Sequence, residues 1–350
     1  YFNKITDNLI TSKVLPNTSG YGSILTNLGK VRFRGFDAEI TTRNIVKKDF
    51  TWESKFTITY VKNKVLKLPE NGRDKNRQGG YSVKMQDGTT KEFGGVAEGE
   101  PLGRFYGYKK DFIITTPEQA ANARYDTSSK GWDWTTKQKL GVGKKTIGDY
   151  EWKDLNGDDI INSNDMFLLG NTIPHTTGGL NNTFTYKNFT LRIATDFSLG
   201  NVIDNHFRAQ ANANSRNNFA TIHDVASSKM WHKPGDIASI PRYDVESDWD
   251  NGKRNHGRPS SSTIGFSGGS ANTLYIKKGD YLAFREVSLS YPLRTKWLRA
   301  AKIETLDLTA AVYNLGYWTA YDGLTPEVIG ADAGKYSRPR QFIFSVKFTM

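Results

Sequence analysis

Apolar and polar residues alternate along several segments of the chain. In segment 51–60, Trp52, Phe56, Ile58 and Tyr60 are apolar, whereas most residues between them are charged or carry hydroxyl groups. A period of two places successive side chains on opposite faces of a β-strand. Similar alternation predicts further strands at 31–43, 180–186, 189–199, 281–291, 303–315 and 340–350. We therefore expect an all-β chain with about eight antiparallel strands.

The connections between these segments are of very different lengths. Lys187 and Asn188 separate two strands by a tight hairpin, whereas segments 64–102, 111–177 and 201–274 are long, polar loops. Short turns on one side and long loops on the other are typical of outer-membrane β-barrels. A soluble β-sandwich with enlarged loops is the alternative, because alternation alone does not distinguish a lipid-facing surface from a buried one.

Composition narrows the function classes. The chain has no run of ~18 apolar residues, which excludes a helical membrane span but not a β-barrel. It has no cysteine, so it has neither disulfides nor thiolate metal sites. The net charge is +12, but basic residues are mixed with carboxylates along the chain, and we expect no nucleic-acid binding. Eight Trp and seventeen Tyr fit aromatic girdles or sugar-binding surfaces.

Segment 154–165, DLNGDDIINSND, has oxygen-bearing residues at the spacing of a calcium loop. The expected ligands are Asp154, Asn156, Asp158, the backbone carbonyl of Ile160, Asn162 through water, and Asp165. Two residues depart from the usual pattern: Asp159 stands where the turn favours glycine, and Asp165 replaces the longer Glu. We expect a structural Ca²⁺ ion that rigidifies a long loop. The alternative is an Asx-rich turn whose side chains cap backbone groups.

Other chemistry is poorly supported. The five histidines lack metal-site spacing, and the chain has no nucleophile-elbow, phosphate-loop or dinucleotide motif, so we expect no enzyme and no catalytic residue. Four tryptophans in the long loops are candidates for stacking on sugars or packing against a lid protein, and the alternative for each is an interfacial girdle or a loop core. They are Trp132, Trp134, Trp231 and Trp249.

Five phrases resemble a known family. They are EGEPLGRFYGYK (98–109), the segment GDYEWKDLNGDD to NNTFTYKNFTL (148–191), KKGDYLAFREVSLSYPL (277–293), AVYNLGYWTAYDGLTPEV (311–328) and YSRPRQFIFSVKFTM (336–350). In wording and order they resemble the C-terminal part of SusC/RagA-type TonB-dependent outer-membrane transporters of Bacteroidetes. The resemblance implies a barrel of about 22 strands, of which residues 1–350 would supply the C-terminal section with long extracellular loops.

The resemblance also implies a function and partners. It implies TonB-dependent import of oligosaccharides or peptides across the bacterial outer membrane, with a SusD-like surface lipoprotein as lid, contact with outer-membrane lipid, and dimers of such pairs. The plug, the TonB-binding segment and the first barrel strands are absent here. Because the chain begins at Tyr1 without an initiator Met and lacks these parts, we expect a piece of a longer polypeptide. The chain also departs from the family at Met350, where members commonly end in an aromatic residue. The alternative function is a secreted, calcium-stabilised, glycan-binding β protein without transport activity.

One motif predicts side chains that line the barrel lumen. In GRFYGYK, Arg104, Tyr106 and Tyr108 alternate with Phe105 and Gly107. If this segment were a barrel strand, alternate side chains would face the lumen. Which of the two sets faces inward is left open by the pattern.

Overall fold

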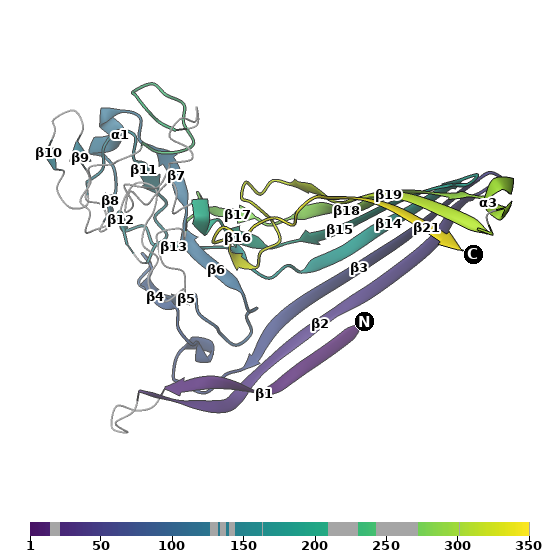
Figure 1. Cartoon of the computed structure of the whole chain (residues 1–350). Coiled ribbons are helices and arrows are strands. Elements are labelled where there is room, and N and C mark those ends of the chain that lie inside the picture. The colour runs from purple at the N-terminus through teal and green to yellow at the C-terminus, as the bar shows by residue number, and fades with distance from the viewer. Residues whose placement is uncertain are drawn as a thin grey trace.

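The chain consists of a long β-sheet and a set of folded loops at one end of it (Figure 1). The computed structural model describes residues 1–14, 22–126, 132–133, 138–139, 144–162, 164–208, 230–242, 272–300 and 302–349. Within these residues, no helix has the length and apolar character needed to cross a bilayer.

The long sheet has eight antiparallel strands, as the alternation predicted, in the order β1-β2-β3-β14-β15-β18-β19-β21. Their bounds are Phe2–Val14 (β1), Ser23–Val46 (β2), Phe50–Lys67 (β3), Thr176–Tyr186 (β14), Phe189–Leu199 (β15), Tyr281–Leu293 (β18), Thr305–Thr319 (β19) and Gln341–Thr349 (β21). The sequence pattern missed β1. Its register shifts between Thr6 and Ile10, where Asn8 has a φ of 57°, and this irregularity breaks the period of two.

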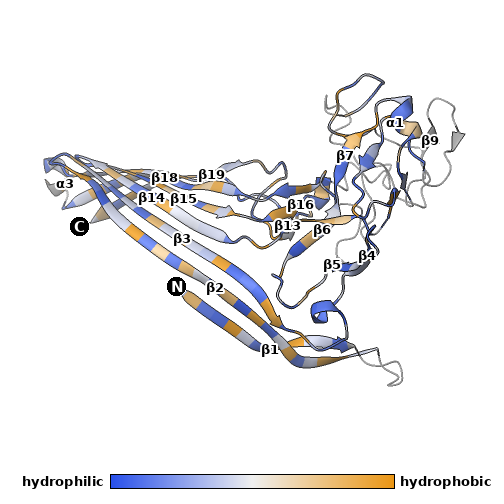
Figure 2. Cartoon of the chain, turned by 180° about the vertical axis from the view of Figure 1, so that it is seen from behind, coloured by the Kyte–Doolittle hydropathy of each residue, from blue (hydrophilic) through white to orange (hydrophobic). Residues whose placement is uncertain are grey.

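The register of the sheet gathers apolar side chains on one face. Phe56 lies opposite Leu180, Ile193 opposite Val287, and Val312 opposite Phe342. Directly opposite residues share a face, so this surface, the apolar face, continues from β2 to β21. Figure 2 shows the resulting alternation of hydrophobic and hydrophilic residues along β2 and β3. Exposed apolar residues on this face include Phe36, Ile40, Leu180, Phe189, Leu289, Phe342, Phe344, Val346 and Phe348.

The opposite surface, the polar face, carries charged and hydroxyl side chains. Lys55 and Glu39 form an ion pair at 2.8 Å, and Arg43 and Glu53 form one at 3.0 Å. Thr59 donates a hydrogen bond to Asp37. One side of the sheet therefore suits water and the other an apolar medium.

The two ends of the sheet differ in their connections (Figure 1). At one end the strands are joined by short segments at 47–49 and 187–188 and by one that contains the helix α3 (Lys296–Ala300). At the other end lie the long connections, as predicted. This end is called the long-loop end.

The described residues of the long connections form six small sheets. Their strands are β4 (Tyr81–Lys84), β5 (Thr90–Phe93), β6 (Arg104–Tyr108), β7 (Lys110–Ile113), β8 (Tyr125–Asp126), β9 (Trp132–Asp133), β10 (Gln138–Lys139), β11 (Tyr150–Trp152), β12 (Ile160–Ile161), β13 (Met166–Asn171), β16 (Val202–Asp204), β17 (Ile276–Lys278) and β20 (Gly330–Ala331). The short helices are η2 (Asp74–Asn76) and α1 (Pro117–Ala121).

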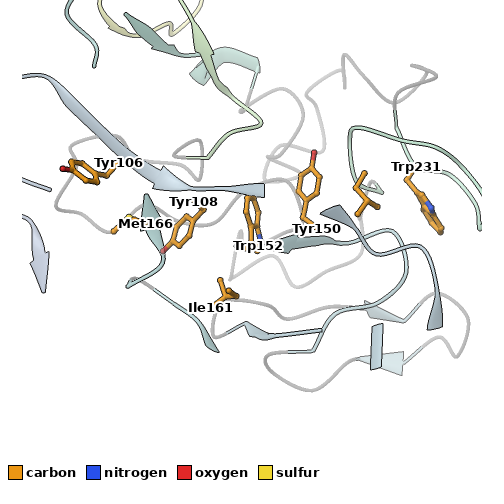
Figure 3. Packing of buried hydrophobic residues seen from close by; sticks show 8 residues of the cluster. Tyr106, Tyr108, Tyr150, Trp152, Ile161, Met166 and Trp231 are labelled. Carbon is orange, nitrogen blue, oxygen red and sulfur yellow. The ribbon is translucent and has the colours of Figure 1, made fainter. Parts of the chain in front are cut away.

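The main hydrophobic core lies in these loops. Its buried residues are Tyr106, Tyr108, Ile113, Tyr150, Trp152, Ile161, Met166 and Trp231. Figure 3 shows Tyr150 and Trp152 between Tyr108 and Trp231. A buried ion pair at 2.6 Å joins Lys145 to Glu151 beside this core. The described residues of 68–175 and 230–242 therefore form a packed unit, the loop module.

Candidate functional site

The first candidate site is a charged network on the polar face at the long-loop end. Arg285 on β18 binds Asp196 on β15 through both Nε and Nη2, and Nη2 lies 2.8 Å from Asp196 Oδ2. Arg285 also pairs with Glu327, whose carboxylate accepts a hydrogen bond of 2.8 Å from Arg338 Nε. The network thus ties segment 320–340, between β19 and β21, to the polar face.

A hollow of about 540 Å³ adjoins this network. Polar lining residues include Asp196, Ser198, Asn201, Tyr281, Arg285, Glu327 and Arg338. A concave surface with fixed donors and acceptors beside aromatic rings can hold a polar ligand such as an oligosaccharide or a peptide. The alternating pattern did not identify these residues as a site. Each strand carries one further charge, Arg192 on β15 and Glu286 on β18, so charge alone does not distinguish Asp196 and Arg285.

The second candidate site is the loop 154–165. Asp154 accepts backbone hydrogen bonds from Gly157 at 2.6 Å and Asp159 at 2.7 Å. Asp159 has a φ of 57°, so an aspartate adopts the left-handed conformation for which glycine is favoured at this position of calcium loops. Side-chain capping of backbone N–H groups, the alternative raised by the sequence, is therefore present in the loop.

Two side chains of this loop have properties that are relevant to metal binding. Asn156 is 7% exposed, and its buried Oδ1 has no hydrogen-bond partner among the described residues. Burial, together with the charges of Asp154 and Asp158, raises the pKa of Asp165 to about 6, although two backbone N–H groups act against this. An unpartnered oxygen and mutually repelling carboxylates are features that a cation would satisfy. Within the described ranges, however, no three His, Cys, Asp or Glu side chains are grouped to hold a metal.

The four predicted tryptophans have different outcomes. Trp231 is 9% exposed and lies in the core of the loop module, an arrangement that favours the loop-core alternative. Its ring lies against Gly148, which is distant in sequence, and its backbone N–H donates to the carbonyl of Ile240. Trp134, Trp249 and the side chain of Trp132 lie outside the described residues.

The prediction for segment 104–108 is also wrong. This segment is β6, which pairs with β13 and not with any strand of the long sheet. Tyr106 and Tyr108 are buried in the loop module, and Phe105 packs in a second small cluster with Ile276. The alternation was real, but both faces of this strand are covered by other loops.

Comparisons with known proteins support the predicted resemblance. No family model matches the chain. Two TonB-dependent receptors of Formosa agariphila are 28% and 27% identical to it, over 93% and 98% of this chain. The TonB-dependent receptor SusC of Bacteroides thetaiotaomicron is 23% identical over 99% of this chain. These alignments cover 30%, 31% and 29% of the three relatives, so the chain spans about a third of their length.

Solved structures show the same fold. The RagAB peptide transporter matches with a TM-score of 0.61, and the RagAB peptide importer in its open-open state with 0.63. Both are 15% identical in sequence, and each match covers 99% of this chain and 32% of the other. The resemblance to SusC/RagA-type TonB-dependent transporters that the five phrases predicted is therefore confirmed over nearly the whole chain.

Proposed function

We propose that this chain is part of the barrel of a TonB-dependent nutrient importer in the bacterial outer membrane. The observation that carries the proposal is the apolar face, which continues from β2 to β21 of the long sheet and leaves Phe342 and Phe344 75% and 71% exposed. An apolar surface of this kind suits lipid, and the polar face suits a water-filled lumen. The similarity to TonB-dependent receptors supports the same role.

The long sheet needs further strands to close. Within the described residues, β1 and β21 each pair with one strand of the sheet, so both edges present unpaired backbone groups. Closed barrels remove such edges, and a membrane-spanning sheet requires closure. We propose that the parent protein supplies the remaining strands, the plug and the TonB-binding segment, and that residues 1–350 form the C-terminal section.

The polar face supports a proposal for the class of cargo. The hollow beside Arg285 offers charged groups and a tyrosine, which suit oligosaccharides or peptides. The solved structures that are similar to this chain are those of the RagAB peptide transporter and the RagAB peptide importer. We propose that a SusD-like lipoprotein covers the long-loop end and delivers the cargo, that such pairs form dimers, and that TonB opens the path. This role requires no catalytic residue.

We further propose that loop 154–165 binds Ca²⁺. Asp154, Asp158 and Asp165 would supply carboxylate oxygens, and the unpartnered Oδ1 of Asn156 would add an amide oxygen. Ile160 would contribute its carbonyl, and Asn162 would act through water. The ion would neutralise the repulsion among the carboxylates and hold the loop against the rest of the loop module.

The alternative, a secreted glycan-binding protein, is less well supported. A water-soluble protein would leave the apolar face against water, and large apolar patches of this kind promote association. The calcium loop fits both proposals. The apolar face therefore distinguishes them.

Transport by the full-length protein tests the proposal. Cells that express the parent polypeptide should take up fluorescently labelled oligosaccharides or oligopeptides larger than porins admit. Uptake should be lost when TonB is deleted and restored when TonB is supplied again. A protein that is recovered in the soluble extracellular fraction, and whose loss leaves uptake unchanged, would favour the glycan-binding alternative.

A further inference from the structure

Four basic side chains are gathered on the apolar face at the long-loop end. Arg32 on β2 lies opposite Lys64 on β3, and Arg34 lies opposite Lys62. Since opposite residues share a face and residues two apart share it as well, all four lie together. These residues, Arg32, Arg34, Lys62 and Lys64, are called the basic cluster.

The basic cluster borders the aromatic part of the same face. Phe36, two residues after Arg34 on β2, lies opposite Tyr60, two residues before Lys62 on β3. The rings of Phe36 and Tyr60 stack with their centroids 5.8 Å apart. Lys62 Nζ is 5.4 Å from the centroid of the Tyr60 ring. Ile58 and Ile40 continue the apolar face beyond this pair. The cationic groups therefore stand directly beside the apolar band, at the level where lipid headgroups meet aromatic residues in barrels.

The cluster has no counter-charge within the described part of the chain. On the polar face Lys55 is paired with Glu39, whereas none of the four basic residues forms an ion pair with a described residue. Opposite Arg32 and Arg34, β1 presents the uncharged Ile5 and Asn3. Like charges directly opposite each other destabilise a sheet, so an external anion would relieve the repulsion.

A hollow of about 560 Å³ is built around the cluster. It is lined by Arg32, Phe33, Arg34, Val61, Lys62, Asn63, Lys64, Gly99, Pro101, Asn171, Ile173, Pro174 and His175, none of which is acidic. The nearby Glu100 is held elsewhere, by Arg104 at 2.9 Å and Arg77 at 3.1 Å. Arg32 Nε is buried and has no hydrogen-bond partner among the described residues.

We propose that the basic cluster binds the phosphate group of an anionic glycolipid in the outer leaflet. Arginine forms paired hydrogen bonds to phosphate oxygens, and lysine adds point charges. The acyl chains of the same lipid would lie along Phe36, Tyr60 and Ile40. The inference rests on the proposed membrane role, because that role places the apolar face in lipid and the long-loop end outside the cell.

Native mass spectrometry of the full-length protein in a non-ionic detergent tests the inference. The probes are monophosphoryl lipid A, the same lipid without its phosphate, and inorganic phosphate. The test variants are the double substitution Arg32→Gln/Lys64→Gln and, because Arg32 is partly buried, the exposed pair Arg34→Gln/Lys62→Gln. The control Lys47→Gln/Lys48→Gln removes the same charge from a short turn at the opposite end.

We expect wild type and control to bind the phosphorylated lipid in preference to its dephosphorylated form. Each test variant should lose affinity by about tenfold or more, since each loses two cations beside an anionic headgroup. Equal affinity for both lipids, or unchanged binding by both test variants, would overturn the inference. Displacement of the lipid by millimolar inorganic phosphate would assign the site to free anions instead. A protein that fails to insert into liposomes would refute the membrane role itself, whereas normal insertion without lipid preference refutes only this inference.

Discussion

Arg285 on β18 and Asp196 on β15 form a two-point ion pair across neighbouring strands, with Nη2 2.8 Å from Oδ2. Because Arg285 also pairs with Glu327, one side chain connects the long sheet to segment 320–340. A planar guanidinium can make these contacts together, whereas a lysine cannot reproduce the two-point pair.

Loss of this connection should loosen segment 320–340. For Arg285→Gln, we expect faster hydrogen exchange in this segment and a stability loss of about 1 kcal/mol, since the pair is partly exposed. Arg285→Lys should recover only part of the protection. Arg192→Gln is the control, because Arg192 lies on the same face and contacts Glu286 only at 3.9 Å. Equal exchange in wild type and Arg285→Gln would contradict the anchoring role.

Replacing the proposed calcium ligands should expose the loop 154–165 to protease. In the presence of Ca²⁺, the Asp154→Ala/Asp158→Ala variant should be cleaved here much faster than the wild type, because it has lost two of the three proposed carboxylate ligands. The measurement is limited proteolysis with peptide mapping. Asp87→Ala is the control, since Asp87 is an exposed carboxylate in another loop turn. If the variant and wild type are cleaved alike with Ca²⁺ present, the loop needs no metal.

In the absence of Ca²⁺, the stability of loop 154–165 should fall as pH rises. The pKa of Asp165 is raised to about 6 from 3.8, chiefly by burial, so the folded state binds this proton more tightly than the unfolded state. In chelator, resistance to protease should therefore be greatest near pH 4 and decline through pH 6. Added Ca²⁺ should protect strongly at pH 7.5 and weakly at pH 5. An Asp165→Asn variant should lose this pH dependence, and a wild type that shows none would contradict the assignment.

Removing the buried Trp231 ring should destabilise the loop module. Trp231→Ala is expected to cost about 3–5 kcal/mol, as is typical for a buried aromatic residue. The measurement is urea unfolding of the loop module, monitored by hydrogen exchange. Trp297→Ala is the control, because Trp297 in α3 is 63% exposed. A selective loss of cargo binding with unchanged stability would instead restore the ligand-contact hypothesis.

A charge on the apolar face should impair membrane insertion. Leu180→Arg near the centre of β14 should destabilise the inserted barrel by about 2–4 kcal/mol, the cost of a cation near the bilayer midplane. Asn181→Arg, one residue further along and on the polar face, is the matched control and should insert normally. Urea unfolding from liposomes measures both. Similar losses for both variants would argue against a lipid-facing surface.

The local pattern predicted the strands well. A period of two indicates both that a segment forms a strand and on which face of the sheet each of its side chains lies. Seven strands of the long sheet and the 187–188 hairpin were found in this way. The strand β1 was missed because its register shifts near Asn8 interrupt the period. The turn at Asp159 was likewise anticipated, since oxygen-bearing residues at fixed spacing determine it locally.

Long-range packing was not predictable from the same patterns. The alternation of Tyr106 and Tyr108 identified a strand but not the loops that cover both of its faces. The ring of Trp231 lies against Gly148, which is too far away in sequence to form a recognisable motif with it. The basic cluster could be recognised only once the register of β2 against β3 was known.

Lipid exposure of β15 tests the central claim most directly. This chain contains no cysteine, so single cysteines can be placed at each position from Thr190 to Ser198 in a cysteine-free full-length protein. After spin labelling in liposomes, accessibility to oxygen and to a water-soluble relaxant is measured by electron paramagnetic resonance. We predict strict alternation, with oxygen favoured at Leu191, Ile193 and Phe197 and the aqueous reagent at Arg192 and Asp196. Equal access of the aqueous reagent to both sets would contradict a membrane-embedded sheet.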